Sequence, residues 1–316
     1  MGEVGGLTFF ASREHYARHM APTAALLGLP ILKRADRKVM TGPVVIAGAS
    51  DLDQVPRRCP VALQSHGAEQ TYIGLDHRSW AGGAHRGRIS LYLVPRAETA
   101  ALNTQRYPES RSAVVGCPAL DRYADLARGG YDREKYGKPL VVFTFHPSYA
   151  VAQQIPELRS AFDHYRSAIP ETVEALRAEG VDVVGHWHPR SPGTRNFWRS
   201  IGVQPVEDWD SLLGRLSALV ADNTSALPEA MAVGGSAVFL NTPVYRRDVI
   251  HGGRFWTWPR GGFSCDDPAD LTARVLRALG GPPPEAQEVA LSIYGPLGGA
   301  AERAAAAIRE WSAEQV

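Results

Sequence analysis

The stretch Gln64–Gly74 contains the histidine best suited to acid–base chemistry, His66, directly after a short apolar run. A histidine at the carboxyl end of a strand can take a proton from an acceptor hydroxyl, because its unperturbed pKa is about 6.5. Gly67 permits close backbone approach, and we assign it to the acceptor side together with Gln70 and Thr71. A histidine that hydrogen-bonds a neighbouring loop would fit the stretch equally well.

A second polar turn, Gly185–Arg190, follows another apolar run. His188 and Arg190 can both donate hydrogen bonds to phosphate oxygens. His186 and His188 form a His-x-His pair that a metal could use, but no acidic or cysteine partner is nearby in sequence. We therefore expect phosphate contact rather than a metal, and a loop packed by Trp187 is the alternative.

A third turn, Asp222–Ser225, lies between an apolar run and a helical segment. Thr224 or Ser225 can cap that helix, whose free N–H groups and dipole suit a phosphate. We expect Asn223, Thr224 and Ser225 to hold a nucleotide-activated donor, and Glu229 to accept hydrogen bonds from its ribose hydroxyls. An ordinary capped helix explains the two hydroxyl residues as well.

Short apolar runs alternate with helical stretches, which predicts βαβ units and parallel sheets. The expected strands cover residues 7–11, 43–47, 61–64, 89–94, 113–116, 139–145, 181–185, 203–206, 217–221 and 236–240. The expected helices cover residues 13–27, 98–106, 155–179, 209–216, 227–233 and 300–311, and segments 252–263 and 280–284 are expected to be loops. The fold class is therefore α/β, with two Rossmann-like, doubly wound domains facing a central cleft.

The polar stretch 120–138 indicates a crossing between the two domains. We expect an acceptor-side domain over residues 1–135 and a nucleotide-donor domain over residues 136–298. The closing helix within residues 299–316 is expected to pack back on the first domain.

Composition excludes several function classes. The net charge of +1 over 316 residues gives no global field for nucleic acid. The short basic run at residues 85–88 indicates a solvated loop in which Arg86 and Arg88 could help an anionic acceptor to dock. The three cysteines lie far apart in sequence, so we expect no metal and no cofactor. Without a signal peptide or a long apolar run, we expect a cytoplasmic protein with at most peripheral membrane contact.

The order and spacing of these turns resemble the CDP-glycerol glycerophosphotransferase family, which makes teichoic-acid-type polymers and has the GT-B fold. The resemblance rests on the His-Gly motif within Gln64–Gly74, on Gly116–Asp121 as the linking motif, on His188-Pro189 and on the turn Asp222–Ser225. It implies that His66 activates the acceptor, while His188, Thr224 and Ser225 hold the donor's diphosphate.

The resemblance leaves the donor open. Asn223 and Thr224 replace the family's usual Tyr-Ser, and Ala68-Glu69 replaces its Thr-Pro. The segment Leu227–Ala232 is similar instead to nucleotide-sugar glycosyltransferases, whose glutamate binds ribose. The donor is therefore CDP-glycerol, another CDP-alditol or a nucleotide sugar, and the acceptor is a hydroxyl compound.

Two rival functions remain open. One is an enzyme of the UDP-N-acetylglucosamine 2-epimerase type, which would need acid–base carboxylates, with Asp51, Asp53 and Glu69 as candidates. The other is a non-catalytic nucleotide-binding protein, because a fold alone does not imply a function.

Overall fold

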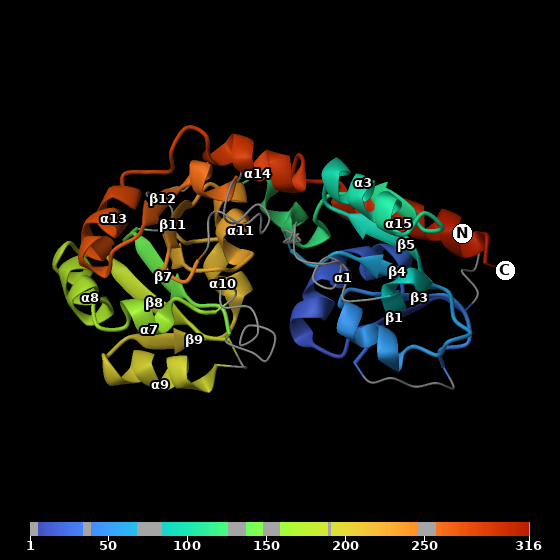
Figure 1. The fold of residues 1–316 in the computed structure, drawn as a ribbon, viewed down its shortest axis with the longest axis horizontal. Coiled ribbons are helices and arrows are strands. Elements are labelled where there is room, and N and C mark those ends of the chain that lie inside the picture. The colour runs from blue at the N-terminus through green and yellow to red at the C-terminus, as the bar shows by residue number, and fades with distance from the viewer. Residues whose placement is uncertain are drawn as a thin grey trace. The chain divides into compact units, whose positions relative to one another are not determined.

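The structure is a computed structural model that describes residues 6–33, 39–67, 84–125, 137–147, 159–188, 191–245 and 257–315. The chain forms two compact units, one made of Met1–Ala124 with Ser292–Val316 and the other of Asp125–Leu291. The predicted boundary between residues 135 and 136 lies at the margin of a stretch outside the described residues. Each unit has a parallel sheet with helices on both faces (Figure 1).

The sheet of the first unit has the strand order β2-β1-β3-β4-β5-β6. Its elements are β1 (Thr8–Phe10), α1 (Glu14–Leu27), β2 (Ile31–Leu32), β3 (Val44–Ile46), η1 (Ala49–Gln54), β4 (Val61–Gln64), η2 (Ala84–Arg88), β5 (Ile89–Val94), α3 (Ala97–Arg106), β6 (Arg111–Val114), η3 (Pro118–Tyr123) and α15 (Ala300–Ala313). Every strand pair in this sheet is parallel.

The sheet of the second unit has the order β12-β11-β10-β7-β8-β9, and all of its pairs are parallel too. Its elements are β7 (Leu140–Thr144), α7 (Phe162–Tyr165), α8 (Ile169–Ala178), β8 (Asp182–His186), α9 (Pro192–Ser200), β9 (Gln204–Val206), α10 (Trp209–Leu213), β10 (Ala218–Ala221), α11 (Ala226–Ala232), β11 (Ser236–Leu240), η5 (Trp258–Gly261), β12 (Phe263–Cys265), η6 (Pro268–Asp270) and α13 (Leu271–Ala278). The helix α14 (Ala286–Tyr294) then carries the chain from the second unit back to the first.

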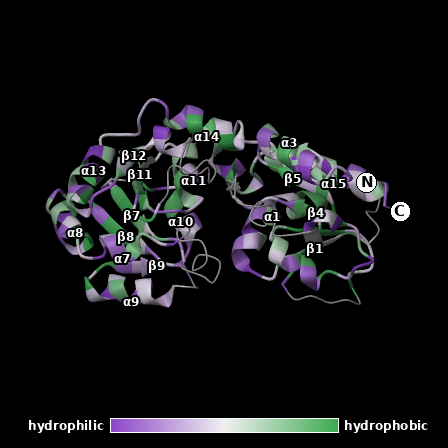
Figure 2. Cartoon of the chain, viewed as in Figure 1, coloured by the Kyte–Doolittle hydropathy of each residue, from purple (hydrophilic) through white to green (hydrophobic). Residues whose placement is uncertain are grey.

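The strands are apolar on both faces because helices cover both sides of each sheet. In the first unit, Phe9 packs on one face against α1 and α15, and the next residue, Phe10, packs on the other face near η1. In the second unit, Val141 and Phe143 share one core with Trp198 of α9. Figure 2 shows the same arrangement as hydrophobic strands between helices with hydrophilic outer faces.

The sequence predicted the strands well but missed some elements. The segment expected to be a loop up to residue 263 leads into β12, an edge strand of only three residues, and α9, α13 and α14 were not predicted. The single helix expected over residues 155–179 is divided in its described part into α7 and α8. Pro170 stands in the first turn of α8, where its missing N–H costs nothing.

The linking motif Gly116–Asp121 has a clear structural role within the first unit. The Asp121 carboxylate accepts hydrogen bonds from the backbone N–H groups of Gly298 (3.1 Å), Ala300 (3.2 Å) and Ala301 (2.7 Å). It therefore caps the amino end of α15, although it is distant from that helix in sequence. Gly116 has a φ of +87°, and a Cβ there would lie 3.2 Å from the Cβ of Ala300.

We expect Asp121→Ala to lower the free energy of unfolding by about 2–3 kcal/mol, because three N–H groups lose a charged acceptor. Urea unfolding of the full chain measures this loss. Glu302→Gln removes an exposed carboxylate from the same helix and should change stability by less than about 0.5 kcal/mol. Equal stability of the two variants would show that the capping bonds contribute little.

Candidate functional site

Polar residues of the first unit gather at the carboxyl edge of its sheet. The chain leaves β1 toward β2 on one side and continues on the other side at β3, so the strand order reverses between β1 and β3. Such a reversal opens a crevice at the carboxyl ends of the strands, where ligands bind in open α/β sheets. The loops that follow β1, β3 and β4 all lie at this edge.

His66 stands at this edge, two residues after β4 ends. The residue is partly open to solvent, while its ring packs against α1. The distance from His66 Nδ1 to the carbonyl oxygen of Ala47, which follows β3, is 2.7 Å. Since a carbonyl only accepts, Nδ1 carries the proton and donates it in this bond. The neutral ring therefore keeps its lone pair on Nε2, which is the form that a general base requires.

The surroundings of His66 favour the neutral ring. Desolvation is the largest cause that lowers the pKa of His66 below its ordinary value, and the positive charges of Arg86 and Arg13 act in the same direction. The hydrogen bond with Ala47 and the charge of Asp51 oppose this shift. A histidine with a lowered pKa is uncharged at neutral pH, so its Nε2 can accept a proton there.

Residues of α1 surround the ring. The ring of Tyr16 lies 4.8 Å from that of His66 in an edge-on contact, and the rings of His15 and His19 lie 6.2 Å away. The Gln64 amide donates a hydrogen bond to the His19 carbonyl and so ties β4 to α1.

Two further contacts fix the loop after β3. The Asp51 carboxylate accepts hydrogen bonds from the backbone N–H of Ser12 (3.1 Å) and from its hydroxyl. A Cβ on Gly48 would meet the Tyr16 ring at 2.1 Å, so only glycine allows this approach. The loops after β1 and β3 therefore hold the Ala47 carbonyl in place for His66.

The carboxyl edge of the second unit is organised by Asp222, which follows β10 and is fully buried. Its Oδ1 accepts a hydrogen bond from the backbone N–H of His146 (2.7 Å). Its Oδ2 accepts from the Ser160 hydroxyl (2.9 Å) and from the Ala161 N–H (2.8 Å). The first residue of the predicted donor turn thus ties together three segments at the point where the strand order reverses between β10 and β7.

His146 follows β7, and it lies close enough to His188, the predicted phosphate contact, to be affected by its charge. Desolvation, followed by the charge of His188, lowers the pKa of His146 to about 4. The sequence analysis missed His146, although His146-Pro147 after β7 repeats the pattern of His188-Pro189 after β8.

Of the two predicted capping residues at the turn after Asn223, the structure uses Thr224 and not Ser225. Ser225 occupies the N-cap position of α11, but its side chain makes no capping hydrogen bond. The Thr224 hydroxyl instead accepts from the Ala226 N–H at 3.3 Å. Asn223 is buried, and its Oδ1 has no hydrogen-bond partner within the part of the chain that the structure describes. A buried amide oxygen without such a partner can accept a hydrogen bond from a bound ligand.

Glu229 is buried in α11, and its Oε2 accepts a hydrogen bond from the Trp209 indole N–H at 2.8 Å. The Trp209 ring packs edge-on against His186 at 5.4 Å, and His186 Nδ1 lies 2.7 Å from the Thr144 hydroxyl. A chain of contacts therefore runs from Glu229 to β7. The predicted ribose contact of Glu229 stays a prediction.

The predicted acceptor-side residue Gly67 directly follows His66. Gly67 has a φ of +72°, in the left-handed region that favours glycine. Gln70, Thr71, Glu69 and Arg190 lie outside the described residues.

The expectation of a solvated loop at residues 85–88 was wrong for Arg88. Its guanidinium donates to the carbonyl oxygens of Leu52 (3.1 Å), Val55 (3.3 and 3.4 Å) and Pro56 (2.8 Å). These bonds hold Arg88 at the amino end of β5, away from His66, whereas Arg86 lowers the pKa of His66. Only Arg86 therefore remains a candidate for docking an acceptor near His66.

Comparisons with solved structures place these two units among known folds. The UDP-N-acetylglucosamine 2-epimerase of Methanocaldococcus jannaschii, solved with UDP-GlcNAc and UDP, is similar with a TM-score of 0.56 and 14% identity over 96% of this chain and 99% of that one. The wall teichoic acid polymerase TagF is similar with a TM-score of 0.61 and 9% identity over 98% of this chain and 88% of that one. The S. aureus MnaA–UDP structure gives 0.58 and 14%, over 98% and 97%.

This chain has the GT-B fold. It has two parallel six-stranded sheets, and it is similar to these structures over most of their length. At such low identity the similarity shows the GT-B fold alone. No protein-family model matches the sequence, and no curated protein matches it. Within the described residues of this GT-B chain, no helix is long and apolar enough to cross a membrane, and no three potential metal ligands cluster.

His146 predicts a pH-dependent stability. Its folded pKa of about 4 is below the ordinary value of 6.5, so between these values the unfolded chain binds a proton that the folded chain does not. The stability is fully present above pH 6.5 and decreases as the pH falls toward 4. We expect this decrease to be on the order of 2 kcal/mol for the His146 contribution.

His146→Gln should remove that part of the pH dependence. The measurement compares urea unfolding of the wild type and the variant at neutral pH and near the lower pKa. His164→Gln, which changes a histidine of α7, is the control. Equal pH slopes for His146→Gln and the wild type would contradict the shifted pKa.

Proposed function

We propose that the chain is a GT-B-type transferase that moves a glycosyl or glycerophosphoryl group from a nucleotide-activated donor to an acceptor hydroxyl. The observation that carries this proposal is the bond from His66 Nδ1–H to the Ala47 carbonyl, which leaves a neutral Nε2 on a residue that is partly open to solvent. A fixed base of this kind is suited to activate a hydroxyl.

The proposed reaction has a simple balance. The acceptor hydroxyl transfers its proton to His66 Nε2 while its oxygen forms a bond to the donor's reactive carbon or phosphorus. The bond between that atom and the leaving nucleotide's phosphate oxygen breaks, and the nucleotide takes the electron pair.

The second unit would hold the leaving nucleotide. His188, Thr224 and Ser225 lie on the loops after β8 and β10, at the carboxyl edge where nucleotides bind in such sheets. The Oδ1 of Asn223, which has no hydrogen-bond partner among the residues that the structure describes, would be a further polar contact for the nucleotide donor. We assign His188, Arg190, Asn223, Thr224 and Ser225 to donor binding. We retain Glu229, whose Oε2 accepts from the Trp209 indole, as the proposed ribose contact.

A UDP-N-acetylglucosamine 2-epimerase is the alternative function, since solved epimerases have the same fold. Of its candidate carboxylates, Asp51 is buried in hydrogen bonds to Ser12, and Asp53 lies with Arg88 in another pocket. Glu69 lies outside the described residues. A non-catalytic nucleotide-binding protein would not need a base at His66.

We expect the protein to release nucleotide from CDP-glycerol, a second CDP-alditol or a UDP-sugar only when an acceptor alcohol is added. Chromatography of the reaction measures free nucleotide and any epimer. Epimer formation from UDP-N-acetylglucosamine without an acceptor would support the epimerase. Nucleotide binding without release from any donor would support the non-catalytic protein.

We expect His66→Gln to lower kcat on the donor so identified by about 10²- to 10⁴-fold, because glutamine cannot take the proton. Donor affinity measured by calorimetry should change by less than about threefold, since the donor is bound by the other unit. His164→Gln serves as the matched control. A loss of donor affinity in folded His66→Gln would reject the role of base.

The activity should also depend on pH through His66. Because the base must be unprotonated, kcat/KM should fall as the pH falls through the pKa of His66, which is lowered below 6.5. The rate should therefore be constant through neutrality and show its acid limb below pH 6.5. An acid limb that stays in place in His66→Gln would assign this titration to another group.

A further inference from the structure

A pocket with a volume of about 520 Å³ lies in the first unit, lined by Asp53, Val55, Pro56, Arg57, Arg58 and Arg88. Its arginines stand at the amino ends of strands. Arg57 and Arg58 precede β4, and Arg88 immediately precedes β5, its parallel neighbour. His66 follows the other end of β4. The length of this four-residue strand, about 13 Å, therefore separates the pocket from His66.

Arg88 forms the fixed part of the pocket. Its guanidinium is held by carbonyl oxygens of Leu52, Val55 and Pro56, which are neutral groups. These bonds orient the guanidinium. None of them is to a carboxylate, so they do not neutralise its positive charge. A guanidinium already held in one geometry loses little side-chain entropy when it binds an anion.

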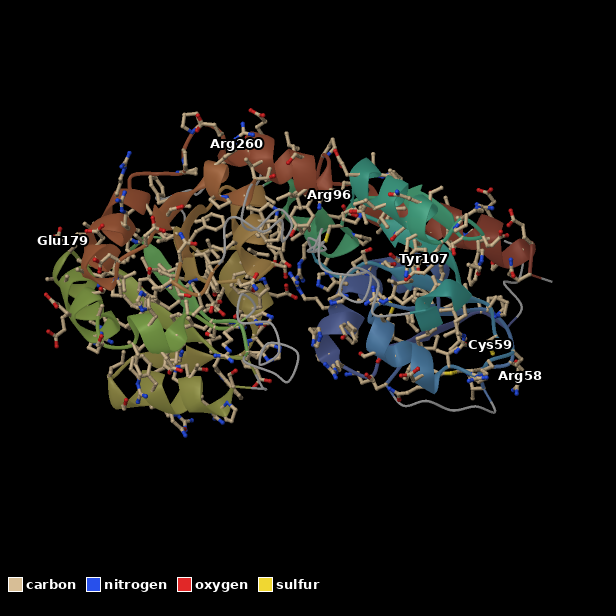
Figure 3. All side chains as sticks on the ribbon, viewed as in Figure 1. Arg58, Cys59, Arg96, Tyr107, Glu179 and Arg260 are labelled. Atoms are coloured by element: carbon tan, nitrogen blue, oxygen red, sulfur yellow. The ribbon has the colours of Figure 1, made fainter. Side chains whose placement is uncertain are left out.

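Two exposed arginines complete the pocket. Arg57 and Arg58 have exposed side chains, and Figure 3 shows Arg58 at the margin of the first unit beside Cys59. The charges of Arg58 and Arg88 both act on the Cys59 thiol, where they oppose the rise in pKa that burial causes. The positive charges therefore converge on one small region.

Asp53 gives the pocket a second chemical property. Asp53 is exposed, and with it the lining carries three positive groups and one negative group. A carboxylate repels a simple anion but accepts hydrogen bonds from hydroxyl groups. The lining therefore fits a molecule that carries both a phosphate and hydroxyl groups, and the volume is within the range of small-molecule sites.

We propose that this pocket is a second binding site, separate from the candidate catalytic edge, for a small phosphate monoester whose organic part carries hydroxyl groups. Arg57, Arg58 and Arg88 bind the phosphate, and Asp53 accepts from a hydroxyl. Val55 and Pro56 form the apolar wall against which the organic part packs.

The test is calorimetry of the full chain with ribose 5-phosphate, inorganic phosphate and ribose at physiological ionic strength. We expect ribose 5-phosphate to bind more tightly than phosphate, and ribose not to bind. The double variant R57Q/R58Q should weaken binding of ribose 5-phosphate at least about tenfold, because two charge-assisted contacts are lost. Asp53→Asn should reduce the preference for ribose 5-phosphate over phosphate.

A matched control removes the same charge elsewhere in the first unit. R106Q/R309Q changes two exposed arginines outside the pocket and should alter the affinity by less than about twofold. Equal weakening in both double variants, unchanged affinity in R57Q/R58Q, or no binding of either phosphate compound up to about 10 mM would overturn the proposal. His66→Gln should bind as the wild type does, so failure of the transferase proposal and failure of this one are distinguishable.

Discussion

The parallel direction of every strand pair is the constraint on which the arrangement of polar residues depends. Parallel strands all end at one edge, so residues that are far apart in sequence meet there once the sheet forms. In the first unit this brings the Ala47 carbonyl to His66, and in the second it brings Asp222 to His146. The opposite edge of the first sheet collects other residues, among them the pocket-lining Arg57, Arg58 and Arg88.

Two aspartates in the sequence motifs hold the framework. Asp121 caps α15 and so joins the end of the chain to the first unit, and Asp222 holds the segments after β7. Each carboxylate accepts three hydrogen bonds, which stabilises backbone that would otherwise lack partners. We therefore propose that ligands at the second edge contact the neighbours of Asp222, above all Asn223, whose Oδ1 has no hydrogen-bond partner among the described residues.

The sequence predicted the fold to a large extent because buried parallel strands are uninterrupted apolar runs, and β4, β5 and β11 fall at the predicted positions. Short edge strands such as β12 lack that signal. The position of His66 was predictable, whereas its tautomer was not, because the Ala47 carbonyl lies on another strand. Likewise, the bonds of Arg88 depend on a turn distant in sequence, and no local pattern indicated that its guanidinium is held by carbonyl groups.

The proposed chemistry depends on the protonation state of one ring. If His66 donates from Nδ1 to Ala47 and is neutral, its Nε2 can accept the acceptor's proton, and the other parts of the transferase proposal follow from that group. Nitrogen-15 NMR of histidine-labelled protein, titrated across the neutral range, reports the tautomer and the pKa of this ring directly. The account predicts a neutral ring protonated on Nδ1 at pH 7, with a pKa below 6.5. A ring protonated on Nε2 alone, or one that is still charged at pH 7, would contradict it.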